Sequence, residues 1–106
     1  TMHERKQMMV ERADAFVILP GGLGTMDEFF EIMTWRQLGL QDKPVVVVNI
    51  EGYWTPLLRM IDHLIEEGFA READRQALLV VDKVEDVVEA LSTAPRERLS
   101  PQSKWI

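Results

Sequence analysis

The segment Pro20-Gly21-Gly22-Leu23-Gly24-Thr25-Met26-Asp27-Glu28 decides how this chain folds. The apolar run before it, residues 15–19, is typical of a buried strand, and the residues after it, 29–33, continue at helical spacing. A strand therefore leads into a glycine-rich turn, and the turn opens a helix. In α/β proteins this arrangement holds phosphate, because glycines let the backbone come close and free N–H groups at the helix start attract an anion.

The turn does not match the common phosphate-loop patterns. It lacks the G-x-x-x-x-G-K-S/T sequence of P-loop nucleoside triphosphatases. The run Gly22-Leu23-Gly24 also lacks the third glycine of the dinucleotide fingerprint. The helix instead begins with a carboxylate, Glu28. A phosphate seat beside an acid suggests chemistry on a phosphorylated small molecule rather than binding alone.

The composition is that of one acidic globular domain. The chain has 106 residues, of which 46% are hydrophobic, and a formal net charge of −6 from 18 acidic and 12 basic residues. No basic stripe is interleaved with aromatic residues, which argues against nucleic acid as a partner. No apolar run approaches the roughly 20 residues that span a bilayer, and no signal peptide is visible, so we expect a cytoplasmic protein with no membrane partner.

Metal and thiol chemistry have little support in the sequence. The chain contains no cysteine, which excludes disulfides, thiolate metal sites and a cysteine nucleophile. Its two histidines, His3 and His63, are far apart in sequence and belong to no metal-ligand pattern. We therefore expect no metal site.

Helical patterns alternate with short apolar runs along the chain. The runs typical of buried strands occupy residues 15–19, 45–48 and 78–81. The helical patterns occupy residues 2–13 and 26–38, the stretch between Thr55 and Gly68, and the stretch after Asp82. Continuous apolar strands alternating with helices predict an α/β fold, with a parallel sheet covered by helices on both faces.

Three local signals refine the predicted helices. In the 26–38 helix we expect an apolar stripe that faces the core, formed by Met26, Phe29, Phe30 and Met33. Gly39 is the residue expected to end this helix. Asp82 and Glu85 suggest a capping box for the last helix. Thr25 and Glu28 fit the same pattern, in which Glu28 would bond back to the Thr25 N–H. A capping role is thus the structural alternative to a chemical role for Glu28.

Two motifs of this chain resemble those of the LOG family. Met2-His3-Glu4-Arg5-Lys6 is similar to the family's M-x-x-R-K motif, and residues 20–28 are similar to its P-G-G-x-G-T-x-x-E motif. Residues 34–39 and 43–45 also resemble the family, so that the resemblance covers about residues 1–91. The family comprises cytokinin-activating phosphoribohydrolases and their bacterial relatives, often mislabelled lysine decarboxylases.

The resemblance implies a fold, an assembly and a reaction. The fold is Rossmann-like, and the assembly is a homodimer with the active site near the subunit interface. The reaction is hydrolysis of the N-glycosidic bond of a nucleoside 5′-monophosphate, such as AMP or a cytokinin ribotide, which gives free base and ribose 5-phosphate. No metal or organic cofactor is implied.

The chain departs from the family in its extent. Family members have an N-terminal half with further strands and a second glycine-rich, phosphate-contacting turn, and this chain begins just before the M-x-x-R-K motif. We therefore expect residues 1–92 to be the C-terminal part of a single domain. Residues 93–106, which are rich in proline and serine, are expected to form a tail.

The motif match also implies roles for individual residues. Glu28 is the expected catalytic carboxylate, which stabilises an oxocarbenium-like transition state or positions the attacking water. Arg5 is the second expected catalytic residue, and its role is electrostatic because a guanidinium stays protonated at neutral pH. The expected substrate and phosphate contacts are Met2, Lys6, Gly21, Gly22, Gly24 and Thr25.

Other readings of these residues stay open. Glu31 follows Glu28 on the same helix face and is a candidate supporting acid, whereas Arg5 and Lys6 also fit ordinary solvated charges. A non-catalytic nucleotide carrier or sensor would use the same phosphate seat, and release of base from AMP would distinguish it from a hydrolase. A purely structural interaction domain would show no rise in melting temperature with nucleotide.

Overall fold

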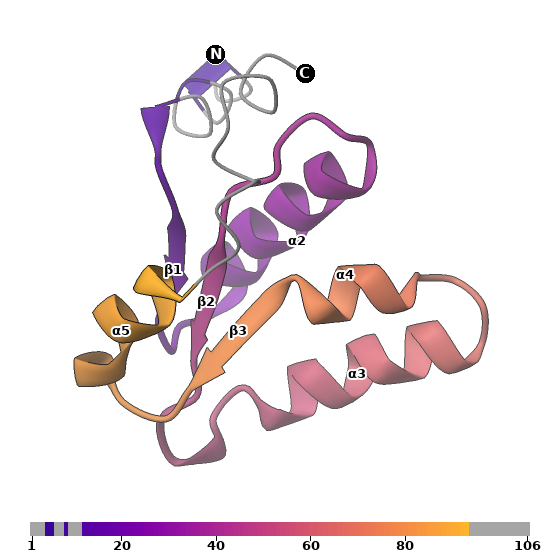
Figure 1. Cartoon of the computed structure of the whole chain (residues 1–106). Coiled ribbons are helices and arrows are strands. Elements are labelled where there is room, and N and C mark those ends of the chain that lie inside the picture. The colour runs from indigo at the N-terminus through magenta and orange to yellow at the C-terminus, as the bar shows by residue number, and fades with distance from the viewer. Residues whose placement is uncertain (1–3, 6–7, 9–11, 94–106) are drawn as a thin grey trace.

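Among the residues that the structure describes, three strands form a parallel sheet in the order β1-β2-β3 (Figure 1). The computed structural model describes residues 4–5, 8 and 12–93. The strands β1 (Phe16–Ile18), β2 (Val45–Val48) and β3 (Leu78–Val81) coincide with the three apolar runs. The predicted α/β, Rossmann-like fold with a parallel sheet is therefore confirmed.

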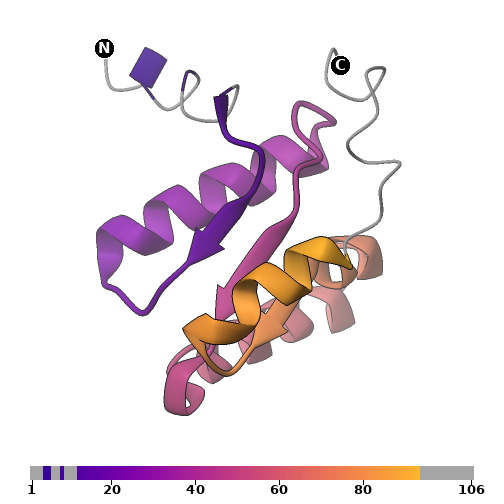
Figure 2. The ribbon, with the colours of Figure 1, turned by 60° about the vertical axis from the view of Figure 1, so that its left-hand side comes forward.

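Helices cover both faces of this sheet, as the alternating pattern predicts. The helices are α2 (Leu23–Gln37), α3 (Thr55–Glu66), α4 (Glu72–Gln76) and α5 (Val87–Ser92), and two single 3₁₀ turns are η1 (Ile50–Gly52) and η2 (Val84–Asp86). Helices α2 and α3 lie on one face, and α5 crosses the other (Figures 1 and 2). Of the predicted 2–13 helix, the described residues Glu4, Arg5, Met8 and Arg12 are helical. The rest of that helix, and residues 94–106, lie outside the described residues.

Strand β2 is the centre of the core. All four of its valines are 0% exposed, because the strand has a neighbour on each side and a helical layer on each face. Val45 and Val47 belong to the cluster that includes Phe29 of α2 and Leu58 of α3. Side chains alternate along a strand, so Val46 and Val48 face the α5 side. A continuous valine run is what a parallel strand buried on both faces requires.

Helix α2 begins earlier than predicted and turns a different face to the core. It begins at Leu23 rather than at residue 26. Phe29 and Ile32 are its buried residues, while Met26 and Met33 pack against the core from its margin. The prediction that Phe30 is buried is wrong, since 38% of it is exposed. Including Ile32 moves the centre of the apolar face round the helix, away from Phe30.

Glycines end the two long helices, and the predicted stops are confirmed. Gly39 has φ +78° and donates its N–H to Arg36 O at 3.0 Å, and the next residue, Leu40, donates to Trp35 O at 2.8 Å. Gly68, with φ +83°, ends α3 in the same way. This is the Schellman arrangement, which needs a residue with positive φ and satisfies the last helical carbonyls.

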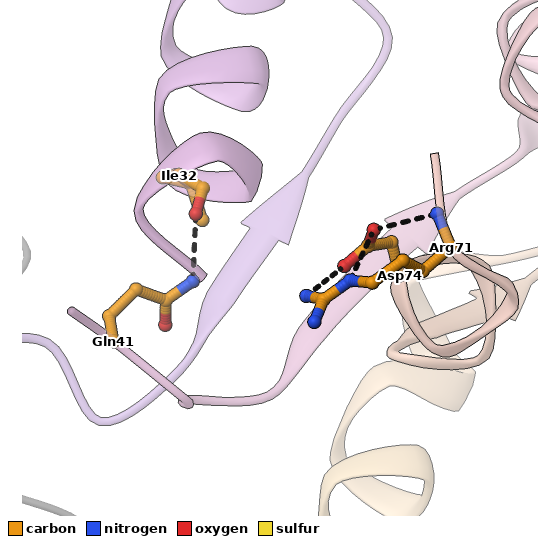
Figure 3. A network of polar contacts seen from close by, with 4 residues as sticks. All are labelled: Ile32, Gln41, Arg71 and Asp74. Carbon is orange, nitrogen blue, oxygen red and sulfur yellow. Dashed lines mark hydrogen bonds and ion pairs between the residues drawn. The ribbon is translucent and has the colours of Figure 1, made fainter. Parts of the chain in front are cut away.

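The region around β3 differs from the prediction in two respects. The short helix α4 was not predicted, because its sequence carries no apolar periodicity. Asp74 stabilises this helix: its carboxylate accepts hydrogen bonds from the Arg71 N–H at 3.1 Å and from Arg71 Nη2 at 3.0 Å (Figure 3). The last helix is split into η2 and α5, whose N-cap residues are Lys83 and Asp86. The expected capping box of Asp82 and Glu85 is therefore wrong.

The outer edge of β1 generates the first prediction. Among the described residues β1 pairs only with β2, and Val17 and Leu19 are exposed beside it. An open edge with apolar side chains invites pairing with another strand. We expect the 106-residue chain on its own to associate through this edge. Val17→Lys should reduce the association measured by sedimentation velocity, because charge on an edge strand opposes pairing.

A matched control for this experiment lies in the loop between α3 and α4, on the far side of the sheet from β1 (Figure 1). Phe69 in that loop is 80% exposed, and Phe69→Lys brings in the same charge. This variant should associate as the unchanged chain does. A monodisperse monomer of the unchanged chain at high concentration would show that the β1 edge does not drive association.

Candidate active site

The glycine-rich turn lies at the carboxyl end of β1 and opens α2. Gly22 is the N-cap residue, and the first helical hydrogen bond runs from the Met26 N–H to Gly22 O at 3.1 Å. The amides of Gly22, Leu23, Gly24 and Thr25 precede that bond and have no acceptor within the helix. Glycine has no side chain with which to cap them. A 15-residue helix thus presents N–H groups without a helical acceptor at its positive end, where the helix dipole favours an anion.

The three glycines of the turn have a different role from the other three of the chain. Gly39, Gly52 and Gly68 have positive φ, whereas the turn glycines do not. A Cβ added at Gly21 would overlap Thr25 Oγ1, so the chain itself requires glycine there. At Gly22 and Gly24 an added Cβ would meet no atom within 4 Å. Neither a positive φ nor a close neighbour explains these two glycines, and both residues are exposed.

The capping alternative for Glu28 is wrong. A capping box places its acid at the third helical residue, opposite the N-cap side chain. In this helix the third residue is Thr25, the N-cap is Gly22, and Glu28 is the sixth residue. Glu28 is exposed at the second turn, a short distance along the helix from the free amides. Its carboxylate therefore has no capping role in α2.

The other predicted site residues do not all lie at the glycine-rich turn. Glu31 and Trp35 follow Glu28 at helical spacing and are partly buried, with Trp35 packed against the core of its own chain. Arg5 is helical and exposed. The helical segment 4–5 lies beyond the amino end of β1, whereas the turn follows its carboxyl end (Figures 1 and 2). Met2 and Lys6 lie outside the described residues. The structure thus gathers the turn residues and Glu28 at the carboxyl end of β1.

Sequence reasoning missed a residue that touches the turn. The Tyr53 hydroxyl donates a hydrogen bond to the Gly21 carbonyl oxygen at 2.5 Å, across 32 positions of sequence. Tyr53 follows η1 at the carboxyl end of β2, and parallel pairing of β1 with β2 brings the two strand ends level. The only sequence signal was Gly52, a turn residue soon after an apolar strand.

Asn49 fixes the loop that carries Tyr53. Its Oδ1 accepts the Trp54 N–H at 2.7 Å, and its Nδ2 donates to Thr55 Oγ1 at 3.0 Å. Its own N–H donates to Val81 O at 2.7 Å. One side chain and its backbone thus join the end of β2, the start of α3 and the end of β3.

The buried polar side chains lie elsewhere and are structural. Gln41 donates from Nε2 to Ile32 O at 2.9 Å (Figure 3). Its Oε1 accepts the Lys43 N–H at 2.8 Å. Gln41 and Asp74 both precede strands and so lie toward the amino end of the sheet. Within the part of the chain that is described, no cluster of His, Asp and Glu could hold a metal ion. No helix in that part has the length and apolar character to cross a membrane.

Comparison with known proteins places the chain in a family. The family model described as "Possible lysine decarboxylase" matches residues 1–91. The chain belongs to the LOG family. The matched LOG relatives include a cytokinin riboside 5′-monophosphate phosphoribohydrolase of Rhodococcoides fascians, which is 47% identical over 90 residues that make up 85% of this chain and 46% of that relative.

Two plant members of the LOG family extend the comparison. The cytokinin riboside 5′-monophosphate phosphoribohydrolases LOG1 and LOG4 of Arabidopsis thaliana are 42% and 44% identical to this chain. The aligned parts cover 98% and 85% of this chain, and 50% and 42% of those relatives. The chain therefore spans about half the length of the curated LOG proteins it matches.

The contrast among the turn glycines predicts opposite effects on stability. Gly24→Ala should stabilise the fold by up to about 1 kcal/mol, because alanine favours the helix and an added Cβ has room. Gly21→Ala should destabilise it by about 1–3 kcal/mol, because the Cβ displaces Thr25. Urea unfolding of both variants measures the difference. Equal free energies of unfolding would mean that Thr25 does not pack against Gly21.

Proposed function

We propose that this chain carries the phosphate site and a catalytic carboxylate of a phosphoribohydrolase that acts on nucleoside 5′-monophosphates. One observation carries the proposal. Gly22 and Gly24 have no close neighbour that would require glycine, and four amides at the helix start, their own included, have no acceptor in the helix. A ligand that comes close to the backbone explains both features. The names of the matched relatives, which act on cytokinin riboside 5′-monophosphate, agree with a phosphate ligand.

In the proposed reaction the 5′-phosphate sits on the turn and the anomeric carbon faces Glu28. The bond between C1′ and the base nitrogen breaks, and its electron pair leaves with the base. Water forms the new C1′–O bond, and its proton is passed to the departing base. The Glu28 carboxylate stabilises the positive charge that develops on the sugar and orients the water. The products are free base and ribose 5-phosphate.

The remaining assignments rest on the family motif. We propose that Arg5 supplies charge complementarity to the sugar phosphate, with Met2 and Lys6 as further substrate contacts and Glu31 as a supporting acid behind Glu28. Thr25 adds its amide to the phosphate site. We propose no metal and no organic cofactor, and AMP and cytokinin ribotides are the candidate substrates. A screen of nucleoside monophosphates with the intact gene product would identify the base.

We also propose a homodimer with the active site near the interface. The outer face of α2 supports this proposal, because Leu23, Phe30 and Leu38 are large apolar residues that it leaves exposed. Leu23 lies directly in the glycine turn, so an interface on this face would border the phosphate site. The proposed cellular location is the cytoplasm, and residues 1–92 are proposed to be one part of a single domain. The 106-residue chain alone is expected to show little activity.

The second candidate function is a nucleotide carrier or sensor without catalysis. It needs the turn but not an acid beside it. The loss of the capping explanation for Glu28 therefore favours the hydrolase, since an exposed carboxylate there has no structural role among the described contacts.

Replacement of Glu28 tests catalysis. In the intact gene product, Glu28→Gln should keep the fold and AMP binding but lower the rate of adenine release at least about 100-fold, because a neutral amide does not stabilise the developing charge. Glu66→Gln, an exposed acid at the far end of α3, is the matched control and should keep full activity. Near-normal turnover by Glu28→Gln would remove the catalytic role.

The proposed phosphate site predicts that one substitution, Gly24→Ala, raises the stability of the fold and weakens AMP binding. Gly24→Ala should unfold at a higher urea concentration and yet bind AMP at least about tenfold more weakly, because the new methyl group occupies the space over the amides. Gly22→Val should abolish AMP binding. Adenosine, which lacks the phosphate, should be a much poorer substrate than AMP. Equal turnover of adenosine and AMP, or unchanged AMP affinity in Gly24→Ala, would contradict the site.

A further inference from the structure

We infer that Tyr53 is a positioning residue for the phosphate turn: its hydrogen bond to the Gly21 carbonyl sets the direction in which the Gly22 N–H points. The inference rests on the proposed function, because it concerns the same phosphate seat. It adds a residue outside both family motifs and assigns it a physical role.

The orientation follows from the planarity of the peptide bond. Gly21 C=O and Gly22 N–H belong to the same peptide unit, and no peptide bond in the described chain is cis. In a trans unit the carbonyl and the N–H point in opposite directions. The Tyr53 hydroxyl holds the carbonyl on one side at 2.5 Å, so the Gly22 N–H is aimed to the other side. A glycine peptide without this restraint would rotate easily, since glycine occupies many backbone conformations.

The loop that carries Tyr53 is built to deliver this hydroxyl. Glu51 has φ +50° and Gly52 has φ +74°, and these two left-handed residues reverse the chain after β2. A left-handed conformation is unusual for glutamate and is kept where the surrounding structure imposes it. Asn49 supplies that restraint by bonding the Trp54 N–H and Thr55 Oγ1. The loop is therefore fixed independently of the bond to Gly21.

The ring of Tyr53 is anchored by a contact that does not involve its hydroxyl. It makes an edge-to-face contact with Trp54, with centroids 4.9 Å apart, and Trp54 is buried in the core. Half of Tyr53, 51%, is nevertheless exposed. Tyr53→Phe thus keeps the ring and its anchor and removes only the bond to Gly21. A solvent-exposed hydrogen bond adds little to folding, so a merely structural role would leave ligand binding unchanged.

The test measures binding of ribose 5-phosphate and of adenine to the intact gene product by calorimetry. Tyr53→Phe should weaken ribose 5-phosphate binding about tenfold and leave adenine binding and the melting temperature unchanged. For AMP turnover, KM should rise more than kcat falls. Ser92→Ala is the matched control, because it removes another exposed hydroxyl that bonds a backbone carbonyl, Glu89 O at 2.7 Å on α5. This control should bind both ligands normally.

The other outcomes separate the two proposals. Unchanged ribose 5-phosphate binding in Tyr53→Phe, or an equal loss of adenine binding, overturns the positioning role. A wild-type protein that binds ribose 5-phosphate but does not release base from AMP overturns the proposed hydrolysis. A tenfold weaker binding of ribose 5-phosphate by Tyr53→Phe would in that case still support the positioning role. Failure of the wild-type protein to bind ribose 5-phosphate overturns both.

Discussion

The parallel pairing of β1 with β2 is the interaction on which the rest of the structure depends. It sets Phe16 beside Val45 and Ile18 beside Val47, so the two strands end at the same level. The turn into α2 and the loop into α3 consequently emerge next to each other. The bond between Tyr53 and Gly21 is the contact that this register allows. Because β2 is fully buried, a slip in register would expose apolar side chains, which keeps the arrangement in place.

The glycine turn shows how stability and function are separated in this fold. The first turn of α2 contains two poor helix formers, Gly24 and Thr25, and its N-cap residue contributes no side-chain hydrogen bond. The helix is secured elsewhere, by burial of Phe29 and Ile32 and by the Schellman ending at Gly39. The proposed function would use this first turn, which the fold does not need for its own stability, to bind the phosphate. The polar groups that the fold does need, on Gln41 and Asp74, are satisfied toward the opposite end of the sheet.

The sequence predicts the strands well and the long-range contacts poorly. Continuous apolar runs reveal β1, β2 and β3, since a strand buried on both faces leaves no polar positions. The start of α2 was misplaced because glycines carry a low helix propensity, and α4 was missed because its five residues depend on the Arg71–Asp74 pair. Glu28 and the turn follow from a local motif. Tyr53 does not, because its contact to Gly21 exists only once two strands have paired.

The central claim is that the backbone amides at the start of α2 bind the phosphate of a nucleoside 5′-monophosphate. Amide chemical shifts of the intact gene product, followed by ¹H–¹⁵N NMR during titration with AMP and separately with adenosine, test it most directly. The account predicts that the largest changes with AMP fall on the amides of Gly22, Leu23, Gly24 and Thr25, and that adenosine leaves these four nearly unmoved. Changes of equal size with both ligands, or AMP changes centred on another part of the chain, would contradict it.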